Sequence, residues 1–248
     1  MTPTTVEREA LRDRRHLVAG SVDLWLVDLS APGTADDLSL LDTSERERAG
    51  RFLIERDRRR FVHAHAALRR ILSRYVGRAA SALRFELEVP HGKPVLVDAP
   101  LHWNLAHSED HAVVGVAAAA VGVDIEALRD RRDVLAMAQR HFNESEVQAL
   151  RARLPADRGA AFLCGWTRKE ACLKAVGIGL RVDTRGLGVG IEPAPKDVRM
   201  QLGRREVRLR VQSVSCRRDL LVAVAQETHE PNADVGVRLL EESVADGA

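Results

Sequence analysis

Hydrophobic residues at every second position predict several strands along the chain. Residues 21–30, SVDLWLVDLS, alternate in this way and are expected to form one strand. Residues 83–96, LRFELEVPHGKPVL, are typical of two short strands with HGKP as the turn between them. The stretches AVVGVA (112–117) and VGVDIE (121–126) are separated by only three alanines, so a hairpin is expected there.

Other segments repeat their apolar positions with the helical period. Residues 41–77 are expected to be helical, with Ser44 and Glu47 as a capping box and Gly77 as the stop. A second helix in this stretch is expected to begin near Asp57 and to turn its apolar positions inward; these are Phe61, Leu68 and Leu72. Residues 133–150 are also helical in pattern, with a break near Asn143.

The end of the chain returns to a strand pattern in residues 186–192, 205–214 and 219–226, and the last fifteen or so residues resemble a loose tail. Helix-rich and strand-rich parts occur in both halves of the sequence. The pattern therefore indicates an α+β protein with two similar-sized lobes, residues 1–118 and residues 119–248. No repeat relates the two halves.

The helix of residues 166–180, WTRKEACLKAVGIGL, carries a carboxylate at a position where an apolar residue is expected. Leu163, Trp166, Leu173 and Gly177 form one helical stripe, and Glu170 falls inside it. A carboxylate on a buried face is costly unless it is paired. A bound metal ion would remove that cost, and so would an ion pair with Lys174 one turn further on. Both explanations remain open from the pattern alone.

A second pair of carboxylates lies in VGVDIE. Because side chains alternate along a strand, Val121, Val123 and Ile125 are expected to face the core, while Asp124 and Glu126 share the other face about 7 Å apart. A hard divalent cation such as Mg²⁺ suits oxygen ligands placed in this way. The alternative is a solvated edge strand.

Several basic residues could bind phosphate near these carboxylates. Lys169 and Lys174 flank Glu170, and Lys93 lies in a Gly-Lys-Pro turn. The segment LHWNLAHSEDH holds three histidines without a neighbouring cysteine, so zinc is disfavoured and a phosphate contact from His107 is the better interpretation. The chain has no Walker A motif, so side chains and a metal ion would have to hold a polyphosphate.

Composition narrows the class of protein. The 248 residues are 45% hydrophobic and 30% charged, with a net charge of +2, as expected for a globular enzyme and not for a nucleic-acid-binding protein. The three cysteines have no metal-binding or disulfide spacing, which favours a reducing compartment. The stretch MTPTTVEREALRDRRHLVAG lacks the apolar region of a signal peptide, and no apolar run reaches the roughly 18 residues of a membrane-spanning helix. We therefore expect a cytoplasmic protein without a nucleic-acid or membrane partner.

The motifs together are more specific than any one of them. VGVDIE, followed about forty residues later by WTRKEACLKAVGIGL and preceded by HGKP and WNLAHS, resembles the 4′-phosphopantetheinyl transferase superfamily. The length and the two lobes in one chain resemble its larger, surfactin-synthetase-activating type. The resemblance implies a pseudo-dimeric fold and a monomer, because two lobes in one chain would complete the cleft.

The resemblance also implies a reaction. The 4′-phosphopantetheine arm of coenzyme A would pass to a serine of an acyl or peptidyl carrier protein, with adenosine 3′,5′-bisphosphate released. Asp124, Glu126 and Glu170 would hold Mg²⁺, or Mn²⁺, and Glu170 would be the candidate base. Lys174 would neutralise the pyrophosphate. The other residues expected to contact coenzyme A are Arg60, Lys93, Pro94, His107 and Lys169.

Two departures from the family pattern are visible. Ala106 stands where the family loop usually has a serine, and Trp103 provides the aromatic position. Lys93 and His107 would contact the phosphates, including the 3′-phosphate. The N-terminal basic residues that reach the 3′-phosphate in some relatives have no assignable match, although Arg46, Arg48 and Arg51 are candidates. The alternatives to a transferase are a non-catalytic module that binds coenzyme A or a carrier protein, and another Mg²⁺-dependent nucleotide phosphotransferase.

Overall fold

The computed structural model describes residues 15–30, 33, 36–88, 92–129, 133–179 and 182–242. Its strands are β1 (Ser21–Asp28), β2 (Phe85–Glu88), β3 (Lys93–Leu96), β4 (His102–Ser108), β5 (His111–Ala117), β6 (Val121–Ala127), β7 (Lys196–Leu202), β8 (Arg205–Val214), β9 (Leu220–Glu227) and β10 (Gly236–Glu241). Its α-helices are α2 (Asp37–Leu40), α3 (Thr43–Ala49), α4 (Glu55–Val76), α5 (Val134–His141), α6 (Glu144–Ala152) and α7 (Arg158–Val176).

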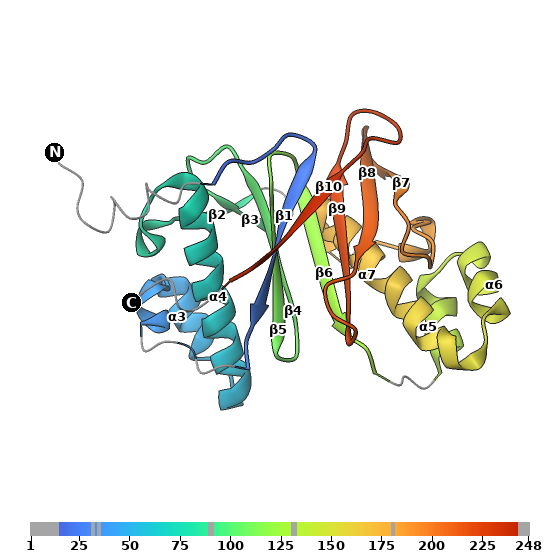
Figure 1. Ribbon diagram of the computed structural model, residues 1–248, viewed down its shortest axis with the longest axis horizontal. Coiled ribbons are helices and arrows are strands. Elements are labelled where there is room, and N and C mark those ends of the chain that lie inside the picture. The colour runs from blue at the N-terminus through green and yellow to red at the C-terminus, as the bar shows by residue number, and fades with distance from the viewer. Residues whose placement is uncertain are drawn as a thin grey trace.

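Two four-stranded sheets lie face to face between two long helices (Figure 1). The first sheet has the order β10-β1-β5-β4 and the second has the order β6-β9-β8-β7. Helix α4 covers the outer face of the first sheet, and α7 covers the outer face of the second. Each lobe is thus a sheet with one long helix outside it, which confirms the expected α+β fold with two lobes.

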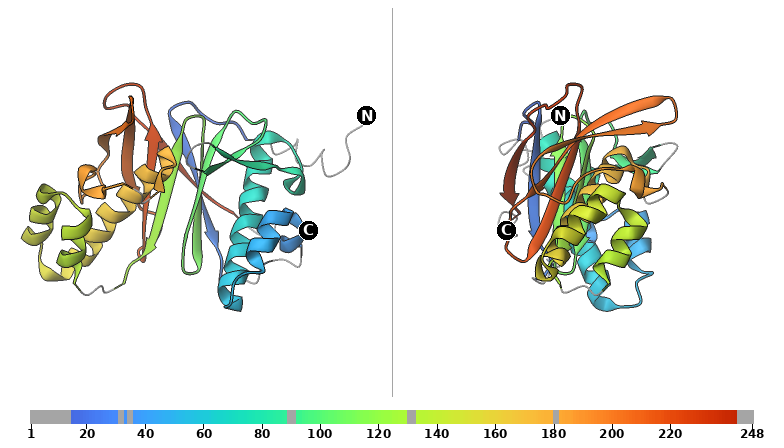
Figure 2. Two further views of the ribbon diagram at one scale, coloured as in Figure 1. Left: turned by 180° about the vertical axis from the view of Figure 1, so that it is seen from behind. Right: turned by 90° about the vertical axis from the view of Figure 1, so that its right-hand side faces the viewer.

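The two sheets share one hydrophobic core. Val22, Leu24 and Leu26 of β1 face this core from the first sheet, and Val121 and Val123 of β6 face it from the second. Burial of so much apolar surface between the lobes is the main force that holds them together. Seen from behind in the left panel of Figure 2, the small helices α5 and α6 lie apart from this core, beside α7.

Most elements expected from the pattern are present. Gly77 ends α4 in the left-handed conformation. Phe61, Leu68 and Leu72 are among the buried residues of that helix. Asn143 breaks the following helical stretch by capping α6. The expected capping box, however, lies two residues earlier than Ser44: Asp42 accepts from the Glu45 backbone, and Glu45 accepts from the Asp42 backbone.

Three expectations are wrong. β5 and β6 do not form a hairpin, because β5 pairs with β1 and β4 whereas β6 pairs with β9 in the other sheet. Residues 187–190 form no strand; they follow a short 3-10 helix, Thr184–Gly186. Residues 236–241 are not a loose tail but strand β10, which runs parallel to β1 in the first sheet.

The end of the chain therefore returns to the first lobe. Arg238 of β10 donates to both carboxylate oxygens of the buried Asp23, at 2.6 and 2.8 Å. Arg70 of α4 pairs with Glu242 at 2.7 Å. The division of the chain at residue 118 stays a prediction, and it must allow for this last strand. Among the described residues, none of the helices has the length and apolar character needed to cross a membrane.

Candidate active site

The candidate carboxylates come together because β6 and α7 are in backbone contact. A Cβ atom at Gly122 would lie 2.0 Å from the Ala171 oxygen and 2.3 Å from the Ala175 nitrogen, so glycine permits this approach. Asp124 and Glu126 follow on the same face of β6, and Glu170 lies on the facing side of α7. The alternation expected for VGVDIE is observed, with Val121, Val123 and Ile125 in the core.

Lys174 links the strand and the helix. Its ammonium donates to Oδ1 of Asp124 at 2.5 Å. Asp124 Oδ2 and Glu170 Oε1 are buried and have no hydrogen-bond partner. Burial raises the pKa of Asp124 to about 7; Lys174 opposes this shift, whereas Glu170 and Glu126 add to it. Burial also raises the pKa of Glu170, and nearby Glu126 adds to that shift.

These buried acceptors fit a divalent cation. Unpaired carboxylate oxygens in a site of low polarity are costly, and a hard cation removes the cost by binding them. As they lie, no three acidic, histidine or cysteine side chains in the described parts of the chain form a ready metal cluster. To bind a cation, Asp124 Oδ2, Glu170 Oε1 and Glu126 would have to move closer together. The hydrogen bond from Lys174 to Asp124 Oδ1 would either remain or break in that movement.

Side chains of β4 hold the free edge of β6 in place. β6 is an edge strand of its sheet, so every second residue presents unpaired backbone groups. Asn104 Oδ1 accepts from the Val123 N–H at 2.9 Å, and Ser108 Oγ accepts from the Ala127 N–H at 3.3 Å. Sequence reasoning missed both roles, although both residues belong to the WNLAHS motif that it singled out.

Basic side chains of the first lobe lie near Lys174 and the carboxylates. The pKa of His107, on β4, is lowered by removal of its ring from water and then by the charges of Lys174, His65, Arg48 and Arg60. Five basic side chains thus converge on one region, where an anion would be stabilised. Of the arginines proposed for the 3′-phosphate, Arg48 lies close enough to His107 to lower its pKa, whereas Arg46 donates to the Leu41 oxygen.

Arg60 lies near this region but is engaged by acids. Its guanidinium donates twice to Oδ1 of Asp110 on the β4–β5 turn, at 2.6 and 2.8 Å, and lies 3.7 Å from Asp57. These contacts fix the turn beside His107, and the two carboxylates neutralise part of the charge of Arg60. Its predicted contact with coenzyme A stays a prediction.

A pocket of about 350 Å³ opens beside these basic groups. Phe85, Trp103 and Pro94 give it flat apolar walls, and Arg48 and His65 line it as well. Such a pocket has the dimensions and chemistry for a nucleobase. Pro94 lines this pocket, and its predicted contact with coenzyme A stays a prediction.

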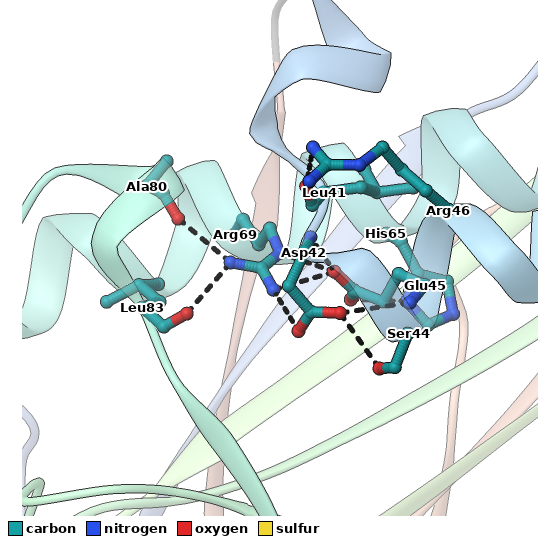
Figure 3. Close-up of polar contacts among 9 residues, drawn as sticks. All are labelled: Leu41, Asp42, Ser44, Glu45, Arg46, His65, Arg69, Ala80 and Leu83. Atoms are coloured by element: carbon teal, nitrogen blue, oxygen red, sulfur yellow. Dashed lines mark hydrogen bonds and ion pairs between the residues drawn. The ribbon is translucent and has the colours of Figure 1, made fainter.

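A buried network supports the wall of this pocket (Figure 3). The fully buried Arg69 of α4 donates to Glu45 and Asp42 at 2.8 Å each and to the oxygens of Leu83 and Ala80 at 2.9 and 3.2 Å. His65 contacts Glu45 at 2.9 Å. Burial acts to raise the pKa of Glu45, but hydrogen bonds from His65 and Arg69 bring it below its ordinary value. The network holds α3, which carries Arg48, against α4.

Lys169 is engaged away from the three carboxylates. It is fully buried, pairs with Glu146 at 2.9 Å and donates to the oxygens of Thr184 and Leu187. It lies one residue from Glu170, a turn of about 100° around the helix, and therefore faces α6 and the 184–187 segment. Its predicted contact with coenzyme A stays a prediction, and the contacts of its ammonium lie on the side of α6 and the 184–187 segment. Lys93 is also engaged: its ammonium donates to two main-chain oxygens, Val121 and Ala175.

Comparison with known proteins assigns these residues to a family. A family model described as the 4′-phosphopantetheinyl transferase superfamily matches residues 120–225, which include Asp124, Glu126, Glu170 and Lys174. The 4′-phosphopantetheinyl transferase HetI of Nostoc sp. is 35% identical over 171 residues, covering 66% of this chain and 72% of that protein. The chain belongs to the 4′-phosphopantetheinyl transferase superfamily. The family expected from the motifs is thereby confirmed, and so is the class of enzyme.

Two further relatives of this transferase agree. A putative 4′-phosphopantetheinyl transferase of Synechocystis sp., slr0495, is 33% identical over 161 residues, which cover 63% of this chain and 65% of the relative. The 4′-phosphopantetheinyl transferase Sfp of Bacillus subtilis is 28% identical over 144 residues, covering 58% of this chain and 63% of the relative. The matched family region contains both β6 and α7, the two elements that carry the candidate carboxylates.

Proposed function

We propose that this protein transfers the 4′-phosphopantetheine arm of coenzyme A to a serine hydroxyl of an acyl or peptidyl carrier protein. The observation that carries the proposal is the meeting of three carboxylates and Lys174 at the lobe junction, opposite His107 and Arg48. An anionic pyrophosphate needs a region of this kind, with cations on one side and metal-binding oxygens on the other.

In the proposed reaction, the serine oxygen forms a bond to the phosphorus that bears the pantetheine arm. The bond from that phosphorus to the bridging oxygen breaks, and adenosine 3′,5′-bisphosphate leaves with that oxygen. Mg²⁺, or Mn²⁺ in its place, supplies charge neutralisation at the pyrophosphate when it is bound by Asp124, Glu126 and Glu170. Lys174 adds a further positive charge on the same side.

Glu170 is the proposed base for the serine proton. With Oε1 on the cation, the second carboxylate oxygen of Glu170 would accept the proton, directly or through a water. His107, Arg48 and the pocket beside them would orient the nucleotide half of coenzyme A. Because both lobes of one chain contribute, we propose that a monomer is sufficient for activity.

Intact-mass spectrometry of an apo carrier domain tests this proposal. Incubation with the protein, coenzyme A and Mg²⁺ should add about 340 Da to the carrier, the mass of the transferred arm. EDTA should abolish the gain, and Glu170→Gln should reduce its rate by at least about a hundredfold. Glu206→Gln is the matched control, because Glu206 is an exposed acid on β8.

The outcomes separate the alternatives. Loss of transfer in Glu170→Gln with unchanged coenzyme A binding supports the proposed base. A folded wild-type protein that binds coenzyme A but modifies no acyl or peptidyl carrier would instead indicate a binding module. Turnover by Glu170→Gln within a few-fold of wild type would remove Glu170 from the reaction.

A further inference from the structure

Lys93 of β3 is a cation from the first lobe that binds two elements of the second. Its ammonium donates to the main-chain oxygens of Val121 and Ala175, each at 3.0 Å. Val121 begins β6, three residues before Asp124, and Ala175 directly follows Lys174 on α7. One ammonium group therefore joins the strand and the helix that carry the candidate metal ligands.

Neither main-chain oxygen has a hydrogen-bond partner from the regular secondary structure of the second lobe. Ala175 lies in the last turn of α7, where the main-chain oxygens have no partner within the helix and where a positive charge is stabilised by the helix dipole. Val121 shares the free edge of β6 with Val123 and Ala127. Side chains of the first lobe, Lys93, Asn104 and Ser108, thus bind this edge in place of a neighbouring strand.

The stem of Lys93 packs against the end of the helix. Gly177 caps α7 in the left-handed conformation with φ of 78°, and a Cβ atom added there would lie 3.1 Å from the Lys93 Cβ. Burial lowers the pKa of Lys93 to about 8. Keeping its ammonium charged at the lobe junction therefore costs free energy. A side chain placed in this way is fixed on three sides by the second lobe.

We propose that Lys93 is a positioning residue that sets the spacing between β6 and α7, and with it the approach of Asp124 to Glu170, and that it does not bind a phosphate of coenzyme A. The inference rests on the proposed function for its meaning in the reaction. The spacing itself can be measured through cation binding, without any transfer.

Lys93→Met tests the proposal, because methionine keeps an apolar stem and removes the donors. Binding of Mn²⁺, followed by the electron paramagnetic resonance signal of the free ion, should weaken about tenfold. The kcat should fall by a similar factor, whereas KM for coenzyme A should change by less than about twofold. Lys93→Arg, which can donate to both oxygens, should recover part of the Mn²⁺ affinity.

The opposite pattern would overturn the proposal. A KM for coenzyme A raised about tenfold with unchanged Mn²⁺ binding would make Lys93 a phosphate contact. Unchanged Mn²⁺ affinity and unchanged kinetics would make the two hydrogen bonds dispensable. If wild type transfers no arm, the proposed function fails, but the Mn²⁺ comparison still reports on the role of Lys93.

A second pair of variants decides the question if Lys93→Met does not fold. Gly177→Ala places a methyl group against Lys93, whereas Gly203→Ala meets nothing within 4 Å. Both glycines have positive φ, 78° and 61°, so both variants carry the same kind of backbone strain. Only Gly177→Ala should weaken Mn²⁺ binding, and equal Mn²⁺ affinity in the two variants would contradict the proposal.

Discussion

The surroundings of Asp124 and Glu170 are unfavourable for a charged carboxylate when no ligand is bound. Each has a buried carboxylate oxygen without a partner, and Lys174 contacts only the other oxygen of Asp124. A purely structural ion pair would be expected to satisfy both carboxylates. Unpaired acceptors of this kind are characteristic of sites whose partner is a ligand, because stability is given up there for binding.

Metal-free protein should lose stability as the pH rises through neutrality. The pKa of Asp124 is about 7 in the folded protein and near 3.8 ordinarily, so the folded state holds more protons between these values. The contribution of Asp124 to the free energy of unfolding must then fall as the pH rises from about 4 to about 7. Urea unfolding followed by circular dichroism at several pH values measures this slope.

Matched variants and cation addition locate the effect. Asp124→Asn should remove most of the slope, whereas Asp234→Asn, an exposed acid, should leave it unchanged. Mg²⁺ should stabilise wild type more at pH 8 than at pH 5, since protons compete with the cation. Equal stabilisation by Mg²⁺ at both pH values would show that Asp124 does not bind it.

At the scale of elements, β6 and α7 were predictable but their partners were not. The alternation of VGVDIE determines which residues face the core, and that part was correct. The three alanines between β5 and β6 have the length of a hairpin turn, yet they join strands of different sheets that pack face to face. Lys169 and Lys174 lie on one helix about 140° apart around its axis. Their partners, Glu146 and Asp124, then show which lysine is a buried support and which lies at the carboxylates.

The contact between β6 and α7 depends on the absence of a side chain at Gly122. Gly122→Ala should force the strand and helix apart, because its Cβ would meet backbone atoms that cannot rotate away. We expect a loss of about 3 kcal/mol in unfolding free energy, measured in urea, together with weaker Mn²⁺ binding.

Gly115→Ala is the control for this substitution. Its added Cβ would lie 2.6 Å from a side-chain atom, Cγ1 of Val123, which can move by rotation of that side chain. A smaller cost, about 1 kcal/mol, is expected there, with Mn²⁺ binding unchanged. If the two variants cost the same, the backbone contact at Gly122 is not what limits the approach of β6 to α7.

For the whole molecule, the two lobes depend on each other in two ways. Their sheets share one core, to which β1, β5, β6 and β9 all contribute. The chain also crosses between lobes twice: β6 leaves the first lobe after β5, and β10 returns to it after β9. Neither sheet would keep its inner face covered if the other unfolded.

The two lobes should therefore unfold in one cooperative step. Trp25 lies in the first lobe and Trp166 in the second, so variants that keep one tryptophan and replace the others with phenylalanine report on each lobe separately. The urea midpoints followed by the two fluorescence signals should coincide. Val123→Ala, in the shared core, should lower both midpoints together, at a cost of about 2 kcal/mol. Two separate transitions, or a Val123→Ala effect confined to the Trp166 signal, would mean that the lobes fold independently.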